Sequence, residues 1–225
     1  MSEFQLLING RLVDGDDEFE VINPATEQVL ALCARASAAQ LDEAVLAAKA
    51  AFPGWAARTL EGRREIILRL ADAIEGDASA LARLLTLEQG KPLSEAEAEI
   101  AYSVAFIRQQ ARYDLPVKVI EDSDTRRVEE HRRPLGVVAA IIPWNFPVLI
   151  VAFKLPFALL AGNTVVIKPS PTTPLTTLKV AEMMAGIFPA GVVNVITDLN
   201  DLGERLLTRM SQRSPSQDRL RPDVK

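Results

Sequence analysis

Residues Ala139–Leu175 read AAIIPWNFPVLIVAFKLPFALLAGNTVVIKPSPTTPL and form the most apolar part of the chain. Two polar interruptions break this stretch: a Trp-Asn pair between two prolines, and a Lys-Pro-Ser-Pro sequence further on. A membrane span, a buried core and a ligand-binding site would each explain part of this pattern.

The membrane interpretation fails on the residues inside the run. A span needs roughly 20 apolar residues, but three prolines interrupt residues 137–162, and Asn145 and Lys154 lie within them. A lysine at the centre of a bilayer costs about 2.5–3.5 kcal/mol. We therefore interpret the run as a buried strand followed by a buried helix, and expect no membrane partner.

Strand and helix patterns alternate from this run to the end of the apolar region. The strand-like segments GVVAAIIP, NTVVIKPS and GVVNVIT are rich in Val and Ile. Helical patterns separate them at residues 148–160 and 174–187. Strands of this composition, joined by helices of this length, are typical of a parallel sheet with βαβ crossovers. The sequence therefore predicts an α/β fold with the layout of a nucleotide-binding domain.

The first 35 residues have the pattern of strands joined by turns. Asn9-Gly10 lies between apolar residues and is the strongest short signal for a β-hairpin. The segment FEVINPATEQVLALCA alternates on either side of a second turn at Asn23-Pro24. We expect strands on both sides of each turn.

Four helices are predicted after these strands. Ser37 with Gln40, and Ser94 with Glu97, have the spacing of a capping box. Asp77 is placed to cap the third helix, and Gly90 to end it. The predicted helices cover residues 37–52, 60–74, 77–90 and 94–112.

Residues 115–133 have a different pattern, LPVKVIEDSDTRRVEEHRR, in which apolar and charged side chains alternate. This is typical of a solvent-exposed two-stranded ribbon. A two-stranded ribbon is not stable alone. We therefore expect it to pack on another surface.

Composition narrows the range of partners. The 225 residues carry a formal net charge of −5, which argues against nucleic-acid binding. Cys33 is the single cysteine, so no internal disulfide can form, and a reducing, cytoplasmic location is expected. The N-terminal MSEFQLLINGRL lacks the basic and apolar regions of a signal peptide.

Two candidate sites follow strands of the predicted parallel sheet, where ligands of such sheets bind. At Pro143–Pro147 the prolines restrict the backbone that carries Trp144 and Asn145. An Asn amide at such a position can stabilise a developing oxyanion by roughly 3–4 kcal/mol. At Lys168–Pro171 a cation and a hydroxyl are available to a sugar or a phosphate.

Together these motifs resemble the aldehyde dehydrogenase family. The resemblance is most specific over PLGVVAAIIPWNFPVLIVAFKLPFALLAGNTVVIKPSPTTPLT and extends through VINPATEQVL, LEQGKPLSEAEAEI and FPAGVVNVITD, covering about residues 5–207. It implies an NAD(P)-binding α/β domain with parallel βαβ units, a separate catalytic domain, and a β-ribbon used for oligomerisation.

The resemblance also implies roles for single residues. Trp144 would line the cofactor cleft, Asn145 would be the oxyanion-hole amide, and Lys168 would contact the adenosine ribose. Pro171 stands where many NAD-preferring members have a ribose-binding Glu, so the choice between NAD and NADP stays open. The expected cofactor-binding residues are Ile141, Ile142, Pro143, Trp144, Asn145, Lys168, Pro169, Ser170 and Pro171.

The nucleophilic cysteine and the glutamate base of the family are expected downstream of this chain. Cys33 reads as a small buried residue of a strand, and His131 as a solvated residue of the ribbon. Glu88 reads as a helix-end acid and Glu97 as a capping acid, with no nucleophile paired to either. We therefore expect this chain to be inactive alone towards aldehydes, and we expect no metal site.

The last residues, RMSQRSPSQDRLRPDVK from Arg209, have no apolar period. With one permitted choice of codons, a shifted reading frame of this segment encodes HVAKISFTGSTATGRQ, which has the FTGS turn of the family. We hypothesise that the tail is out of frame. The predicted organisation is a cofactor-domain portion at 1–114, the ribbon at 115–133, a βαβ cofactor segment at 134–208, and an irregular tail at 209–225.

Three interpretations stay open. The chain is a portion of an aldehyde dehydrogenase, or a non-catalytic module that assembles with full-length members or with itself through the ribbon, or one half of a split enzyme. The particular aldehyde cannot be read from these residues.

Overall fold

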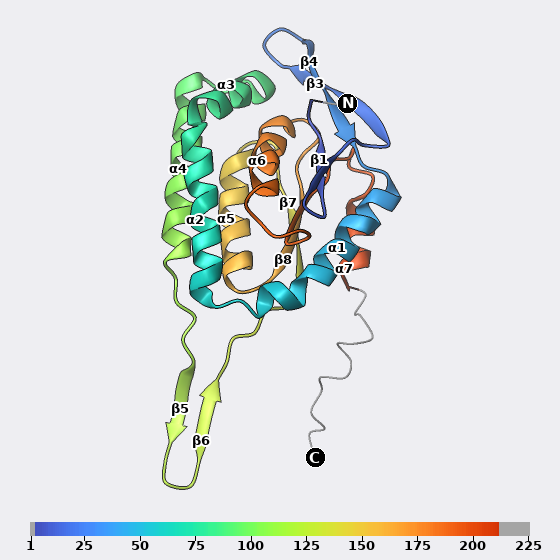
Figure 1. The fold of residues 1–225 in the computed structure, drawn as a ribbon. Helices are drawn as coiled ribbons and strands as arrows, with labels where there is room; N and C mark the ends of the chain where they lie inside the picture. The colour runs from blue at the N-terminus through green and yellow to red at the C-terminus, as the bar shows by residue number, and fades with distance from the viewer. Residues whose placement is uncertain (1–2, 212–225) are drawn as a thin grey trace.

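The computed structural model describes residues 3–211 (Figure 1). A five-stranded sheet, in the order β2-β1-β9-β8-β7, lies at its centre. Helices cover both faces, and a long two-stranded ribbon projects from one end of the body. The sheet strands are β1 (Leu6–Ile8), β2 (Arg11–Val13), β7 (Val137–Ile141), β8 (Thr164–Lys168) and β9 (Val193–Val195).

The parallel part of the sheet is formed by β7, β8 and β9. β7 pairs with β8 from Val137↔Thr164 to Ile141↔Lys168, and β8 pairs with β9. The crossover helices are α5 (Pro147–Leu160) and α6 (Leu175–Ala185). Every residue of β8 is buried, because this strand has neighbours on both sides and helices on both faces. The predicted α/β fold with βαβ units is confirmed.

The hairpin predicted at Asn9-Gly10 joins β1 to β2. Asn9 and Gly10 have φ values of 52° and 75°, as a two-residue hairpin turn requires. β1 also pairs antiparallel with β9, and the side chain of Asn194 accepts a hydrogen bond from the Asn9 N–H at 2.8 Å. The N-terminal hairpin thus extends the parallel sheet at its β9 side.

Two layers of helices sandwich the sheet. The first contains α1 (Ala38–Ala56) and α7 (Gly203–Ser211), which share a buried cluster with the sheet through Leu41, Val166 and Leu206. The second contains α5 and α6 against the sheet. The outer helices α2 (Leu60–Gly76), α3 (Ala78–Gln89) and α4 (Leu93–Ala111) pack over α5 and α6 (Figure 1).

The helix-capping predictions had mixed outcomes. Ser37 and Gln40 form the predicted capping box, and Gly90 ends α3 with a φ of 87°. The predicted box of Ser94 and Glu97 was wrong. The cap position is Pro92, two residues before Ser94, so α4 begins at Leu93 and Ser94 lies inside its first turn. Asp77 precedes α3 as expected but makes no capping hydrogen bond through its side chain.

Two further pairs of strands lie outside the central sheet. β3 (Asp17–Asn23) and β4 (Gln28–Arg35) flank the second predicted turn, and β5 (Lys118–Asp122) and β6 (Arg127–Glu130) form the predicted ribbon. Val119 and Ile120 of the ribbon are exposed to solvent.

The end of the described chain differs from the prediction of an irregular segment from Arg209. The helix α7 continues to Ser211, because the Arg209 guanidinium binds Asp42 of α1 at 2.9 Å and the Arg209 carbonyl accepts a bond from Lys49. The rest of the predicted tail lies outside the described residues. Within residues 3–211, none of the helices is long and apolar enough to cross a membrane.

Candidate functional site

The two predicted motifs meet at one edge of the sheet. Ile141 and Lys168 are the last residues of neighbouring parallel strands and are paired in register. The Ile142 N–H donates to the Lys168 carbonyl at 2.9 Å, which extends the pairing one residue further. The loops that follow, 143–146 and 169–174, therefore leave the sheet side by side.

The first loop presents its polar and aromatic groups to solvent. Trp144 is 58% exposed and Asn145 is also exposed, whereas Ile142 and Pro147 on either side of the loop are buried. Among the described residues, no hydrogen bond engages the Asn145 side-chain amide, which leaves it free to donate to a ligand. The carbonyl of Trp144 accepts a bond from Thr173 at 3.2 Å, and this contact ties the two loops together.

Cations hold the backbone of this loop from two sides. Lys154 donates to the carbonyl of Ile141 at 2.7 Å. Lys91, which lies between α3 and α4, donates to the carbonyl of Asn145 at 3.0 Å and forms an ion pair with the buried Glu99. Neither Lys91 nor Glu99 was assigned to the site from the sequence.

Lys168 is enclosed rather than presented to solvent. Its ammonium forms an ion pair with Asp198, and the two side chains are 4% and 0% exposed. Asn200 accepts a second bond from the same ammonium at 3.1 Å. The other oxygen of Asp198 accepts from the Leu202 N–H at 2.8 Å, next to the start of α7. Lys168, which was predicted to contact a ribose, is therefore neutralised by the carboxylate of Asp198, which follows the neighbouring strand β9.

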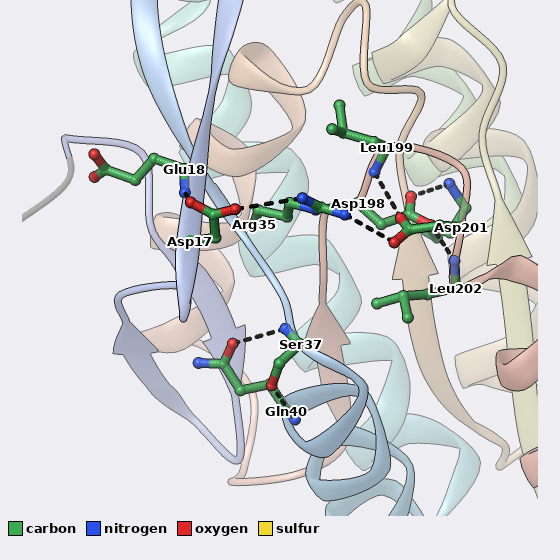
Figure 2. A network of polar contacts seen from close by, with 10 residues as sticks. Asp17, Glu18, Arg35, Ser37, Gln40, Asp198, Leu199, Asp201 and Leu202 are labelled. Carbon is green, nitrogen blue, oxygen red and sulfur yellow. Dashed lines mark hydrogen bonds and ion pairs between the residues drawn. The ribbon is translucent and has the colours of Figure 1, made fainter.

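This buried pair adjoins a second polar group near the surface (Figure 2). Asp201 binds the Arg35 guanidinium at 2.9 Å and accepts from the Leu199 N–H at 3.1 Å. Arg35 also reaches Asp17 at 3.3 Å. These contacts join the segment after β9, which carries Asp198, to the β3–β4 pair.

The rest of the Lys-Pro-Ser-Pro motif forms a turn. Pro169 is buried, and the Ser170 hydroxyl lies 2.9 Å from that of Thr172. Pro171 is half-buried and offers no carboxylate to a ligand.

Glu88 has a structural role that was not predicted from the sequence. Its side chain is buried, and it accepts bonds from the backbone N–H groups of Leu175 and Thr176 at 2.7 and 2.9 Å. It therefore caps α6 from another helix. Burial raises the pKa of Glu88 to about 7, although these hydrogen bonds oppose the rise.

The remaining candidates of the sequence lie away from this edge. Cys33 is fully buried in β4, and burial raises its pKa to about 12, which keeps the thiol protonated and unreactive. His131 is exposed beside Glu129 on the ribbon, and Glu97 is exposed on α4. In the part of the chain that the structure describes, no group of three or more acidic, His or Cys side chains could hold a metal ion.

Comparison with known proteins agrees with this geometry. The sequence model of the aldehyde dehydrogenase family matches residues 12–214. A mitochondrial aldehyde dehydrogenase of Leishmania tarentolae is 42% identical over 200 residues, which are 85% of this chain and 40% of that protein. The protein FUS7 of Gibberella fujikuroi is 34% identical over 204 residues, which are 91% of this chain and 44% of that protein.

Solved structures match with similar coverage. PnpE in complex with nicotinamide adenine dinucleotide superimposes with a TM-score of 0.84 at 38% identity, over 90% of this chain and 43% of that one. The NAD+ complex of aldehyde dehydrogenase from Bacillus cereus gives 0.84 at 38% identity, over 87% and 42%. The chain thus spans less than half the length of the relatives it matches. By sequence and by fold, it belongs to the aldehyde dehydrogenase family.

Proposed function

We propose that this chain supplies the dinucleotide-binding edge and the oxyanion amide of an aldehyde dehydrogenase. The observation that carries the proposal is the exposed amide of Asn145, which has no hydrogen-bond partner among residues 3–211. It lies after the carboxyl end of β7, beside the loop that follows β8. The NAD complexes of PnpE and of the Bacillus cereus enzyme, which share this fold, support a nicotinamide cofactor here.

The residues at this edge fit a dinucleotide. Ile141, Pro143 and Trp144 form an exposed apolar surface of the kind that takes a flat ring, and the hydroxyl of Ser170 lies at the neighbouring strand end. Of the residues expected to hold NAD or NADP, we propose direct contacts for the accessible ones, Ile141, Pro143, Trp144, Asn145, Ser170 and Pro171. The buried ones, Ile142, Lys168 and Pro169, would hold these two loops in place beneath the ligand. When bound, the nicotinamide ring supplies the acceptor for the hydride that leaves the aldehyde carbon.

In oxidation of an aldehyde to a carboxylic acid, negative charge develops on the carbonyl oxygen when a nucleophile adds. The Asn145 amide donates a hydrogen bond to that oxygen and stabilises the charge by roughly 3–4 kcal/mol. Cys33 cannot be the nucleophile, because it is buried in β4 and its pKa is raised to about 12. The nucleophile and the base are therefore assigned to none of the described residues.

Oligomerisation through residues 115–133 is part of the same proposal. Val117, Val119 and Ile120 are exposed on a ribbon that projects from the body (Figure 1), and these side chains would be covered by another copy or by a full-length relative. The single cysteine, buried and unpaired, supports a reducing compartment such as the cytoplasm.

The test is nucleotide binding by the 225-residue chain. The chain is titrated with NAD and with NADP, and binding is measured by Trp fluorescence and by calorimetry. Bound nucleotide should quench the fluorescence of Trp144. A Trp144→Phe variant should lose this fluorescence change but keep the heat of binding. Absence of heat with both nucleotides would refute the cofactor role. If such a chain nevertheless bound a full-length relative in size-exclusion chromatography, the assembly-module interpretation would replace the cofactor role.

A further inference from the structure

The loop that carries Asn145 runs into a helix with no cap of its own. Phe146 is the residue before α5, its side chain makes no capping bond, and Pro147 opens the helix. The N–H groups of Val148 and Leu149 instead donate to one oxygen of Glu99, on α4, at 3.0 and 3.1 Å. Buried N–H groups at a helix start need such acceptors, and here the acceptor comes from a different layer of the fold.

The second oxygen of Glu99 binds the ammonium of Lys91. The same ammonium donates to the carbonyl of Asn145 at 3.0 Å and lies 4.2 Å from the ring centroid of Phe146. The side chains of Lys91 and Glu99 are 9% and 0% exposed, so solvent screens these contacts little. One ion pair therefore contacts Asn145, Phe146 and the start of α5 together.

The position of Lys91 is itself fixed by its neighbours. Gly90 ends α3 in the left-handed region, and a Cβ at Gly90 would lie 2.8 Å from the ring of Pro24. Pro92 follows Lys91 and restricts its backbone. The junction between α3 and α4 thus holds Lys91 over the Asn145 loop, and no residue of the central sheet contributes to the Lys91–Glu99 pair.

We propose that Lys91 and Glu99 are positioning residues that orient the Asn145 amide. Glu99 sets where α5 begins, and Lys91 fixes the Asn145 peptide from which the amide projects. The proposal rests on the proposed function for what the amide does with a substrate. The restraint on the loop is a property of this chain and can be measured without substrate or cofactor.

Trp144 provides the readout, because it precedes Asn145 in the loop and is 58% exposed, whereas Trp55 is 1% exposed. Time-resolved fluorescence anisotropy of the 225-residue chain separates the overall tumbling from local motion of Trp144 in the picosecond to nanosecond range. The Trp144→Phe variant gives the contribution of Trp55 for subtraction. Lys91→Met should add a fast component to the anisotropy decay of Trp144. Lys91→Arg keeps the positive charge, so its fast component should be much smaller than that of Lys91→Met.

Lys179→Met is the matched control. Lys179 also pairs with a carboxylate, Glu182, at 3.0 Å, and it lies 5.1 Å from the ring centroid of Phe4, far along the chain from the Asn145 loop. Both Lys91→Met and Lys179→Met remove a lysine that lies between a carboxylate and an aromatic ring. A general effect of that loss on the structure would therefore change the anisotropy in both variants. Equal anisotropy changes in Lys91→Met and Lys179→Met, or no change in either, would overturn the proposal.

Glu99→Gln decides the question if Lys91→Met does not fold. The amide keeps an oxygen for the N–H groups of Val148 and Leu149 but removes the anion that holds Lys91. We expect circular dichroism to show a folded chain and anisotropy to show faster local motion of Trp144. Unchanged motion of Trp144 in this variant would refute the role of the pair. If the pair restrains Trp144 but the chain binds neither NAD nor NADP, the proposed function is refuted and the positioning role of Lys91 and Glu99 stands.

Discussion

Removing Asp198 should be among the most damaging single changes in this chain. Asp198→Ala leaves the ammonium of Lys168 in a buried site with Asn200 as its remaining partner at 3.1 Å. Removal of one member of a buried ion pair typically costs about 3–5 kcal/mol, because the other charge stays desolvated without compensation. The Leu202 N–H also loses its acceptor, which costs about 1–3 kcal/mol for a buried donor.

These two contributions overlap, since the strand end can relax around both groups. We therefore expect a loss of about 3–5 kcal/mol in the free energy of unfolding. A domain of this kind has a total stability of about 5–15 kcal/mol, so a large share would be lost. Urea denaturation at pH 7, followed by far-ultraviolet circular dichroism, measures the change.

Two further variants separate the charge from the packing. The double variant Lys168→Met with Asp198→Asn removes both charges and keeps an oxygen for Leu202, so it should be more stable than Asp198→Asn alone. Asp72→Ala is the control, because its pair with Arg108 is exposed and should be worth less than about 1 kcal/mol. The reasoning is refuted if Asp198→Ala costs no more than Asp72→Ala at an unchanged denaturant slope.

Three other predictions concern pH, backbone and site. With its pKa raised from 4.5 to about 7, Glu88 stabilises the fold fully below about pH 4.5 and loses this contribution as pH rises through 7, so Glu88→Gln should flatten urea-measured stability between pH 5 and 8. Gly191→Ala should lower the melting temperature, with more than about 1 kcal/mol lost, because φ is 77° and the new Cβ would lie 2.6 Å from the Ala47 carbonyl oxygen. Gly54→Ala, in open space within α1, should instead raise it. Asn145→Ala should leave urea-measured stability within about 0.5 kcal/mol, and a larger loss would mean that the amide is structural.

The features that the sequence predicted correctly are local ones. The Asn9-Gly10 hairpin and the left-handed end of α3 at Gly90 each depend on one or two residues with special backbone preferences. The βαβ units depend on a period and a composition repeated over tens of residues. The sequence also placed both motifs after strands of a parallel sheet, and the structure adds that these strands are neighbours, with Ile141 paired to Lys168.

The partners inside the site could not be predicted in this way. Lys168 is paired with Asp198, which is thirty positions further along the chain, and only the packing of β9 beside β8 brings the two together. The false capping box at Ser94 shows the opposite failure. The spacing was right, but the helix cap lies two residues earlier, at Pro92.

A signal for the distant caps was nevertheless present in the sequence. The crossover helices α5 and α6 begin after Phe146 and Pro174, neither of which can cap a helix with its side chain. Their first N–H groups are buried and must still be bonded, so acceptors had to come from elsewhere. Glu88 and Glu99 are acids at positions where their own helices are buried, and each accepts two of these bonds.

The same logic applies to the chemistry of the proposed site. A loop that follows a parallel strand is anchored by the sheet at its first residue only, at Ile142 here. Its far end needs a second anchor if a side chain such as Asn145 is to be held in one orientation before a ligand arrives. Glu99 provides that anchor at the start of α5. Between the two ends, Thr173 binds the Trp144 carbonyl and Lys91 binds the Asn145 carbonyl. The outer helices α3 and α4 therefore restrain the far end of the Asn145 loop through Lys91 and Glu99, although neither residue is proposed to contact the substrate.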